Sequence, residues 1–132
     1  MLKICAIASG SNGNCYYIGN EQDAILIDAG ISCKQVLQRM KLRDLKPEKL
    51  RAIFISHEHS DHIRGARVLA KRLNIPVKLS EKTYYATYKN LRPAFPEFFV
   101  PGTELQAGEF KVYPFLKNHD AADPCSFRIE YD

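Results

Sequence analysis

The sequence predicts a mixed α/β sandwich, and two observations carry this prediction. Short apolar runs bounded by Gly, Pro, Ser or Asn alternate along the chain with segments of helical spacing. The run at residues 52–55 is apolar throughout, as is typical of a strand that is buried on both faces of a sheet. Strands that alternate with helices indicate a sheet covered by helices, in preference to an all-β barrel.

The first half of the chain is expected to contain four strands and one helix. Ser32 can cap a helix that runs to about Leu42, with Val36, Leu37 and Met40 on its buried face. The strands are expected at Leu2–Ala8, Asn14–Gly19, Ala24–Asp28 and Ala52–Ile55.

The second half is expected to contain two helices and four strands. Residues His62–Leu73 have helical spacing, and Ser80 can cap a second helix that holds Thr83 and the tyrosines up to Tyr88. The strands are expected at Pro76–Leu79, Phe98–Val100, Phe110–Phe115 and Ser126–Tyr131.

Length and composition indicate one soluble domain. The chain has 132 residues, 45% of them hydrophobic and 26% charged, and no apolar stretch long enough to span a membrane. We therefore expect no membrane partner, and the short N-terminal run does not have the pattern of a signal peptide. The four cysteines have no C-x-x-C spacing, which favours reduced thiols and a cytoplasmic location over disulfides or a thiolate metal site. The net charge of +4 permits nucleic acid as a partner without arguing for it.

Three of the four histidines fall within six residues, directly after the apolar run at 52–55. His57 and His59 are two residues apart at the end of a strand, so they project to the same side. Asp61 and His62 follow where a helix begins and can present a second pair of ligands. Imidazole and carboxylate groups in this number suit two divalent metal ions a few ångströms apart. The alternative, a cluster of solvated residues at a helix start, explains this density of histidine less well.

The motif H-x-H-x-D-H after a hydrophobic strand resembles the metal motif of the metallo-β-lactamase superfamily. Four segments are similar to its YycJ/WalJ-like exonuclease branch: residues 8–15 (ASGSNGNC), 27–30 (IDAG), 56–62 (SHEHSDH) and 119–124 (HDAADP). The similarity extends over nearly the whole chain. It implies a four-layer αβ/βα sandwich built from two similar halves.

The resemblance also implies a ligand set. His57, His59 and His119 would hold a first metal, Zn²⁺ or Mn²⁺, and Asp61 and His62 would belong to a second, with Asp61 the candidate catalytic carboxylate. Glu58 alternates away from the histidines and is not expected to be a ligand.

Two further aspartates have two interpretations each. Asp28 resembles the aspartate that orients the histidine loop, although a simple turn residue before Gly30 is a serious alternative. Asp120 is either a supporting residue of the metal site or only part of a loop.

The family pattern includes a later bridging aspartate and a later histidine, and both would lie beyond residue 132. We therefore expect residues 1–132 to be the N-terminal half to two-thirds of a truncated metallo-β-lactamase domain, with one metal or none bound. A lone half would expose an apolar sheet face. Another subunit of a homo-oligomer could cover that face instead.

Substrate contacts are expected on two sides of the histidines. The Gly/Ser/Asn loop with Ser11, Asn12 and Asn14 offers backbone N–H groups to an anion such as phosphate, although plain turns often have this composition. Arg64 begins a basic stripe, continued by Arg67 and Lys71 on the expected helix, which is either a phosphate contact or a solvated face. A further group of aromatic residues is expected in the core, with stacking on bases as the alternative: Tyr84, Tyr85, Tyr88, Phe95, Phe98 and Phe99.

Together these features predict a metal-dependent phosphodiesterase or exonuclease that attacks nucleic acid, DNA rather than RNA, with an activated hydroxide. Two alternatives stay open at this point. The same chemistry also hydrolyses small esters, thioesters or lactams. A non-catalytic metal-binding module or an inactive fragment would result if the second metal's ligands stayed incomplete.

Overall fold

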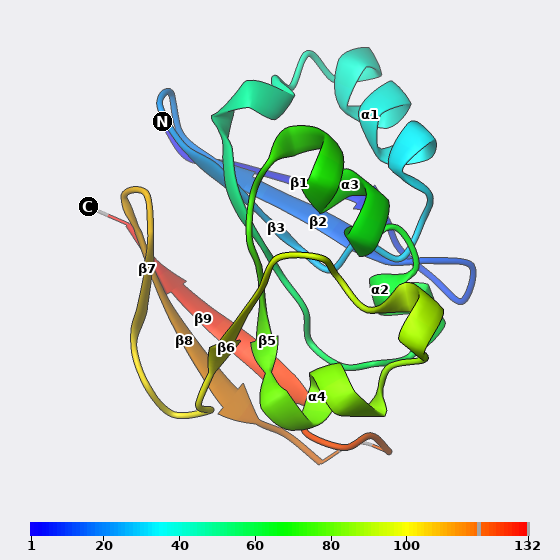
Figure 1. The fold of residues 1–132 in the computed structure, drawn as a ribbon. Helices are drawn as coiled ribbons and strands as arrows, with labels where there is room; N and C mark the ends of the chain where they lie inside the picture. Colours follow the sequence, from blue (N-terminus) through cyan, green and yellow to red (C-terminus); the bar gives the residue numbers. More distant parts are fainter. Residues whose placement is uncertain (119, 132) are drawn as a thin grey trace.

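The computed structural model describes residues 1–118 and 120–131, which contain two β-sheets and their covering helices (Figure 1). The larger sheet has six strands in the order of the sequence: β1 (Lys3–Ala8), β2 (Cys15–Gly19), β3 (Ala24–Ile27), β4 (Leu50–Phe54), β5 (Val77–Ser80) and β6 (Pro96–Phe99). The smaller has three: β7 (Leu105–Ala107), β8 (Phe110–Leu116) and β9 (Cys125–Glu130).

Helices connect the strands that run parallel. β1, β2 and β3 pair antiparallel, whereas β3 to β6 pair parallel, and each parallel pair needs a crossover. The crossovers carry α1 (Cys33–Leu42) and η1 (Pro47–Lys49), then α2 (Ser60–Ile63) and α3 (Ala66–Leu73), then α4 (Glu81–Ala86) and η2 (Lys89–Leu91). This alternation confirms the mixed α/β class.

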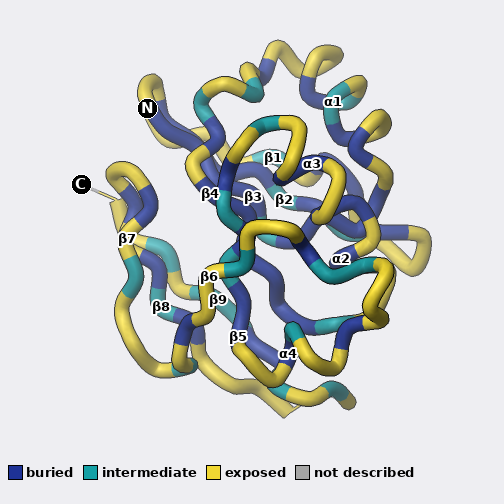
Figure 2. Tube along the Cα trace, viewed as in Figure 1, coloured by how far each residue is buried: buried dark blue, intermediate teal, exposed yellow. Residues whose placement is uncertain are grey.

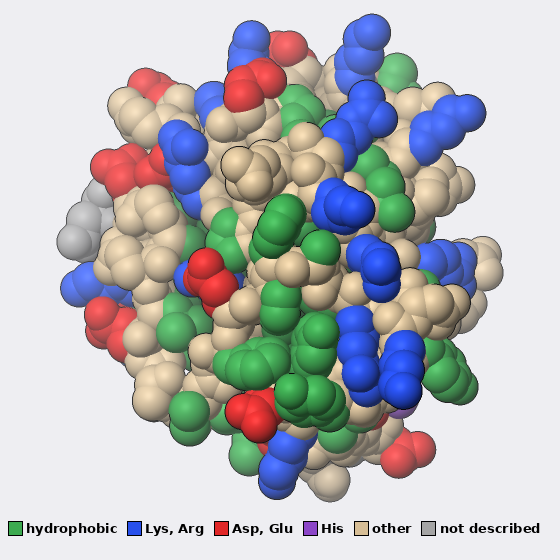
Figure 3. Space-filling view, in the orientation of Figure 1, with side chains coloured by type: hydrophobic (Ala, Val, Ile, Leu, Met, Phe, Trp, Pro, Cys, Tyr) green, Lys and Arg blue, Asp and Glu red, His purple; other side chains and the backbone are tan. Residues whose placement is uncertain are grey.

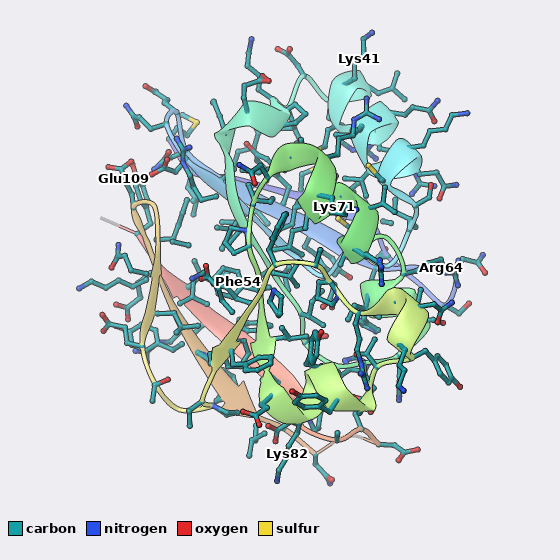
Figure 4. The ribbon with its side chains drawn as sticks, viewed as in Figure 1. Lys41, Phe54, Arg64, Lys71, Lys82 and Glu109 are labelled. Atoms are coloured by element: carbon teal, nitrogen blue, oxygen red, sulfur yellow. The ribbon has the colours of Figure 1, made fainter. Side chains whose placement is uncertain are left out.

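The central strands of the six-stranded sheet, β2 to β5, are buried on both faces (Figure 2). Leu26 and Ile53 belong to the hydrophobic cluster that includes the helices α1 and α3. Ile25 and Phe54, one residue along on the same strands, belong to the cluster shared with the smaller sheet, as alternation along a strand requires. Phe54 lies between the two sheets, with its ring 5.7 Å from that of Phe127 in an edge-to-face arrangement (Figure 4).

Helix α1 confirms the predicted cap. The hydroxyl of Ser32 accepts the Gln35 N–H, and the Gln35 side chain accepts the Ser32 N–H, so two otherwise unpaired donors are satisfied. Val36 and Met40 are buried and Leu37 is half-buried on the face that packs on the sheet.

The single helix expected at His62–Leu73 is wrong, because the chain is divided there into α2 and α3. Gly65 separates the two helices, and its N–H donates to the carbonyl of Ala29 at 2.8 Å. A Cβ at Gly65 would lie 1.9 Å from the carbonyl oxygen of Ile31. Close approach to the neighbouring loop therefore sets the break, and the basic stripe starts on α2 and continues on α3.

Smaller corrections affect boundaries. β3 ends at Ile27 because Asp28 has a left-handed φ of 64°, and α4 ends at Ala86, before Tyr88. The structure adds η1, η2 and β7, which the sequence did not predict.

The aromatic residues between 84 and 99 are mostly not in the core, contrary to expectation. Phe99 is buried and Tyr84 is half-buried, but the other four have exposed fractions of 44–77%: Tyr85, Tyr88, Phe95 and Phe98.

The smaller sheet covers much of the apolar face that was expected to be exposed. An apolar groove remains open between β1 and β9, lined in part by Ile4, Ile18, Phe127 and Ile129. Ile4 is 70% exposed there. Across the described residues, no helix combines the length and apolar character needed to cross a membrane.

Candidate metal centre

Three loops converge where β3 and β4 end, and backbone hydrogen bonds hold them together. Asn14 donates its backbone N–H to the carbonyl of Asp61 at 2.8 Å, and Gly30 donates to the carbonyl of Asn14 at 2.9 Å. Ala29 donates to the carbonyl of His62, also at 2.9 Å. The loop before β2, the loop after β3 and the start of α2 are therefore one continuous unit.

Gly30 is the position at which this unit is tightest. A Cβ there would lie 1.7 Å from the carbonyl oxygen of Asp61 and 2.8 Å from the backbone nitrogen of Asn14. Both contacts are far inside van der Waals distance, and both involve backbone atoms, which cannot rotate away. Only glycine lets the loop after β3 approach α2 this closely, so Gly30 fixes the position of Asp61.

The histidines gather on this unit. His57 follows the end of β4 and is 2% exposed, whereas His59 is exposed and precedes the first residue of α2. The ring centroid of His57 lies 4.7 Å from that of His59 and 3.9 Å from that of His62. The structure therefore brings three of the predicted ligands together.

Asp28 connects the ends of two strands to the histidines. One carboxylate oxygen accepts the backbone N–H of Ser56 at 2.7 Å. The other lies 2.8 Å from the Ser56 hydroxyl and 2.6 Å from Nδ1 of His62. Asp28 is 3% exposed and has the left-handed φ, so it is both a turn residue and a carboxylate directed at the histidines.

This network sets the tautomers of two histidines. A carboxylate only accepts, so Nδ1 of His62 carries the proton and the Ser56 hydroxyl donates to Asp28. The Ser56 oxygen, 2.9 Å from Nδ1 of His57, then accepts from that ring as well. In a neutral ring with its proton on Nδ1, the lone pair is on Nε2, which is the state in which an imidazole binds a metal.

Asn14 and Asp61 lie at the other side of His62. Nε2 of His62 is 3.6 Å from a carboxylate oxygen of Asp61 and 3.4 Å from the side-chain nitrogen of Asn14. That nitrogen is also 3.4 Å from the same carboxylate. The Asn14 amide thus joins the loop before β2 to the polar groups of the candidate centre.

Cys15 lies next to this site without the character of a ligand. Its side chain is buried, and burial, with a smaller contribution from the nearby Asp28 charge, raises the pKa of the thiol to about 12. The group is a neutral thiol at neutral pH. All four cysteines are free thiols.

The donor chemistry fits a divalent metal, although the described part of the chain does not complete a site. Imidazole and carboxylate groups are the ligands that such ions take in proteins, and the Nδ1 contacts match the usual support of ligating histidines. Within residues 1–118 and 120–131, no group of three or more His, Cys, Asp or Glu side chains is arranged to hold an ion. His119, the expected third ligand of the first metal, lies outside the described residues.

Glu58 holds a neighbouring loop by a hydrogen bond. Its carboxylate accepts the backbone N–H of Ala122, with oxygen distances of 3.1 and 3.4 Å. Cys125 donates its N–H to the carbonyl of Ser56 at 2.8 Å. The first contact attaches the segment between β8 and β9 to the histidine loop, and the second attaches the start of β9 to it, while Asp120 is exposed.

The expected substrate residues have different surroundings. Ser11 and Asn12 are exposed at the tip of their loop, whereas Asn14 is half-buried beside the histidines. The N–H groups of Gly10 and Gly13 are engaged within the loop, which leaves fewer donors for an anion than the composition suggested. Arg64 is exposed at the end of α2 (Figure 4).

Ser56 is the residue that sequence reasoning missed. Its hydroxyl relays the Asp28 charge to His57, and its backbone contacts both Asp28 and Cys125. Its signals in the sequence are its place between a buried strand and the first histidine and its membership of the segment 56–62 that carries the resemblance.

A mixed α/β sandwich with histidine and aspartate side chains grouped at the ends of its strands is typical of metalloproteins. The chain belongs to the metallo-β-lactamase superfamily, whose sequence profile matches residues 8–123. This confirms the family and the fold that the motifs indicated.

Two curated relatives within reach of sequence comparison are named as exodeoxyribonucleases. It is 37% identical to "Exodeoxyribonuclease YycJ" of Bacillus anthracis over 93% of the chain and 48% of that protein. It is 34% identical to "Exodeoxyribonuclease WalJ" of Streptococcus pneumoniae over 98% of the chain and 50% of that protein. The chain therefore spans about half the length of these relatives.

Solved structures show the same fold at lower identity. The Rm3 metallo-β-lactamase superposes with a TM-score of 0.79 at 19% identity, over 93% of this chain and 52% of that one. A mutant HARLDQ-motif metallo-β-lactamase of Cronobacter sakazakii gives a TM-score of 0.80 at 17% identity, over 96% and 54%.

Proposed function

We propose that the complete protein hydrolyses phosphodiester bonds at DNA ends, and that residues 1–132 supply most of its metal ligands. The observation that carries this proposal is the hydrogen-bond network from Asp28 and Ser56 to Nδ1 of His57 and His62, because it supports both rings on the nitrogen opposite the one that would bind a metal. The names of the two exodeoxyribonuclease relatives support the substrate class.

His57 and His59, with His119, would hold one divalent ion, Zn²⁺ or Mn²⁺, and Asp61 and His62 would contribute to a second. Such ions supply a hydroxide nucleophile near neutral pH and compensate the charge that develops on the phosphate. The ligands beyond these five would come from the remainder of a protein about twice as long, which agrees with the share of the relatives that the chain covers.

The chain's own residues prepare this centre before any ion binds. Asp28 accepts a hydrogen bond from Nδ1–H of His62, so the ring cannot rotate without losing a charge-assisted hydrogen bond. Asn14 lies 3.4 Å from both Asp61 and His62 and holds these two groups next to each other. Orientation of ligands before binding reduces the entropy cost of assembling the site.

The test is metal-dependent hydrolysis by the complete protein. His57→Ala is expected to abolish release of nucleotides from a DNA end in the presence of Mn²⁺ or Zn²⁺. Asp23→Asn is the matched control, since Asp23 is also buried but bonds Arg51 and the Glu109 N–H, away from the histidines. Unchanged nuclease activity in His57→Ala would refute the proposal.

The same preparations distinguish the alternative functions. Hydrolysis of nitrophenyl esters without hydrolysis of bis-nitrophenyl phosphate would indicate a small-molecule hydrolase. Stoichiometric metal retention with no turnover on either substrate would indicate a metal-binding module. The cytoplasmic location and the homo-oligomer stay predictions, which fractionation and sedimentation can test.

A further inference from the structure

Residues 64–92 form a strongly basic segment of this chain. Residues 64–92 hold eight of the 19 Lys and Arg residues but only one of the 15 Asp and Glu residues. The formal charge of the segment is thus +7, whereas the rest of the chain carries −3. In Figure 3, Lys and Arg side chains form a column down the right side of the molecule that begins over α1 at the top, and hydrophobic side chains gather beside its lower part.

Exposed aromatic side chains form the second part of this surface. Tyr85 is 59% exposed and Phe98 is 46% exposed. The ring of Tyr84 contacts both, with centroid distances of 5.2 Å to Tyr85 and 5.4 Å to Phe98. Tyr88, beyond the end of α4, is 77% exposed. Contiguous exposed apolar groups, unlike single exposed side chains, are typical of a binding site.

Two arginines hold the surface in place. Nε of Arg92 donates to the carbonyls of Tyr84 and Thr87, and its Nη2 donates to that of Tyr85 at 2.9 Å. The Arg92 guanidinium lies 5.3 and 5.4 Å from the centroids of the two tyrosine rings. Arg67 on α3 donates to the carbonyl of Arg92 at 3.3 Å, which ties α3 to the aromatic residues.

The surface begins at the candidate metal centre. Helix α2 contains Asp61 and His62, and Arg64 follows it directly. Arg67 is three residues further along the chain and contacts the segment around Arg92, as described above. The surface therefore extends from the candidate ligands in α2, past Arg64 and Arg67, to the tyrosines that Arg92 contacts.

We infer that this surface, defined by Arg64, Arg67, Tyr85, Tyr88, Lys89 and Phe98, binds single-stranded nucleic acid and leads it toward the histidines. This inference rests on the proposed function for its direction toward the metal centre. The positive charge complements a phosphate backbone, and exposed rings stack on bases that are not paired. The acidic side chain of Glu97, next to Phe98 in β6, is compensated by Lys78 at 2.8 Å.

Binding is measured by fluorescence anisotropy with a labelled oligodeoxythymidine in EDTA, so that no hydrolysis is possible. Tyr85→Ala, Tyr88→Ala and Phe98→Ala are each expected to raise the Kd about fivefold or more. Tyr88→Ala is the variant that keeps the test valid if another variant is destabilised, because its side chain is mostly solvated. Lys89→Ala should lower the slope of log K against log salt by about 0.7.

Matched controls lie elsewhere on the molecule. Tyr113→Ala removes an aromatic side chain that also contacts an arginine, Arg128, but on the smaller sheet. Lys41→Ala removes an exposed lysine of α1 at the opposite end of the molecule from α4 (Figure 4). Both are expected to bind as the unchanged chain does.

Three outcomes would overturn the inference: a Kd within twofold of the unchanged chain for the aromatic variants, an equal loss in Tyr113→Ala, or equal affinity for a blunt duplex. Because the assay contains no metal, its result is independent of nuclease activity. If the aromatic variants lose affinity in EDTA but the complete protein hydrolyses no DNA when metal is added, the proposed function alone is refuted. If the complete protein hydrolyses DNA but these variants bind normally, the inferred binding surface alone is refuted.

Discussion

Asp28→Asn isolates the charge on which the candidate metal centre depends. Asparagine has nearly the same shape as aspartate and also tolerates the left-handed φ of 64° at this position, so the substitution adds little backbone strain. The retained oxygen can still accept the Ser56 N–H. The new NH₂ group, however, is a donor. It faces the Ser56 hydroxyl and Nδ1 of His62, which in the unchanged chain both donate to the Asp28 carboxylate.

The substitution should lower both the stability of the fold and its affinity for metal. Loss of the charge-assisted bonds within a 3% exposed site is expected to lower the free energy of unfolding by about 2–3 kcal/mol. For metal binding the tautomer matters more, because an NH₂ donor at position 28 favours His62 with its proton on Nε2, the nitrogen that would bind the ion. Changes in groups that support metal ligands typically cost about 10–100-fold in affinity, so about 1.4–2.8 kcal/mol of binding free energy should be lost.

Urea unfolding and titration calorimetry with Zn²⁺ or Mn²⁺ measure these two effects separately, and nitrogen NMR of the histidine rings reports the tautomer. Asp23→Asn, at the other end of β3, is the control: it should cost a similar amount of stability and leave metal affinity unchanged. Equal metal affinity in the two variants, or an unchanged His62 tautomer in Asp28→Asn, would refute the reasoning.

Three further predictions concern the scaffold. Gly30→Ala should lower stability by about 3 kcal/mol in urea unfolding and weaken metal binding, because its Cβ would overlap the Asp61 backbone; unchanged binding would contradict this. Phe54→Ala should cost about 3–5 kcal/mol, since the ring is fully buried between the sheets, and a loss below about 1 kcal/mol would show that the sheets do not pack as described. Cys15 has its pKa raised from 9.0 to about 12, so the folded state retains this proton while the unfolded state loses it. Stability should therefore fall above pH 9, by about 1.4 kcal/mol per pH unit from this group. Urea unfolding from about pH 8 to about pH 10 should show that fall in the unchanged chain and a shallower one in Cys15→Ala.

Patterns of local origin were predicted correctly from the sequence. The cap at Ser32, the buried run that became β4 and the alternation of strands with helices depend on neighbours within a few residues. The break between α2 and α3 was missed because its cause is the carbonyl of Ile31, which is far from Gly65 in the sequence. The exposed rings of Tyr85 and Phe98 were missed for a related reason, because the sequence does not show which side of a short helix lacks a neighbouring element.

For the candidate site, the sequence by itself determined which groups are present. Histidines spaced by two after a strand, followed by an aspartate and a third histidine, belong to one short segment, and local geometry alone keeps them close. Only the tertiary structure decided how they are held. Asp28 is 28 residues from Ser56 and 34 from His62, and Asn14 is 47 from Asp61, and no local pattern encodes contacts of that range. The parallel pairing of β3 with β4 brings the ends of both strands to one edge, and there a single buried carboxylate orients His62 directly and His57 through the Ser56 hydroxyl.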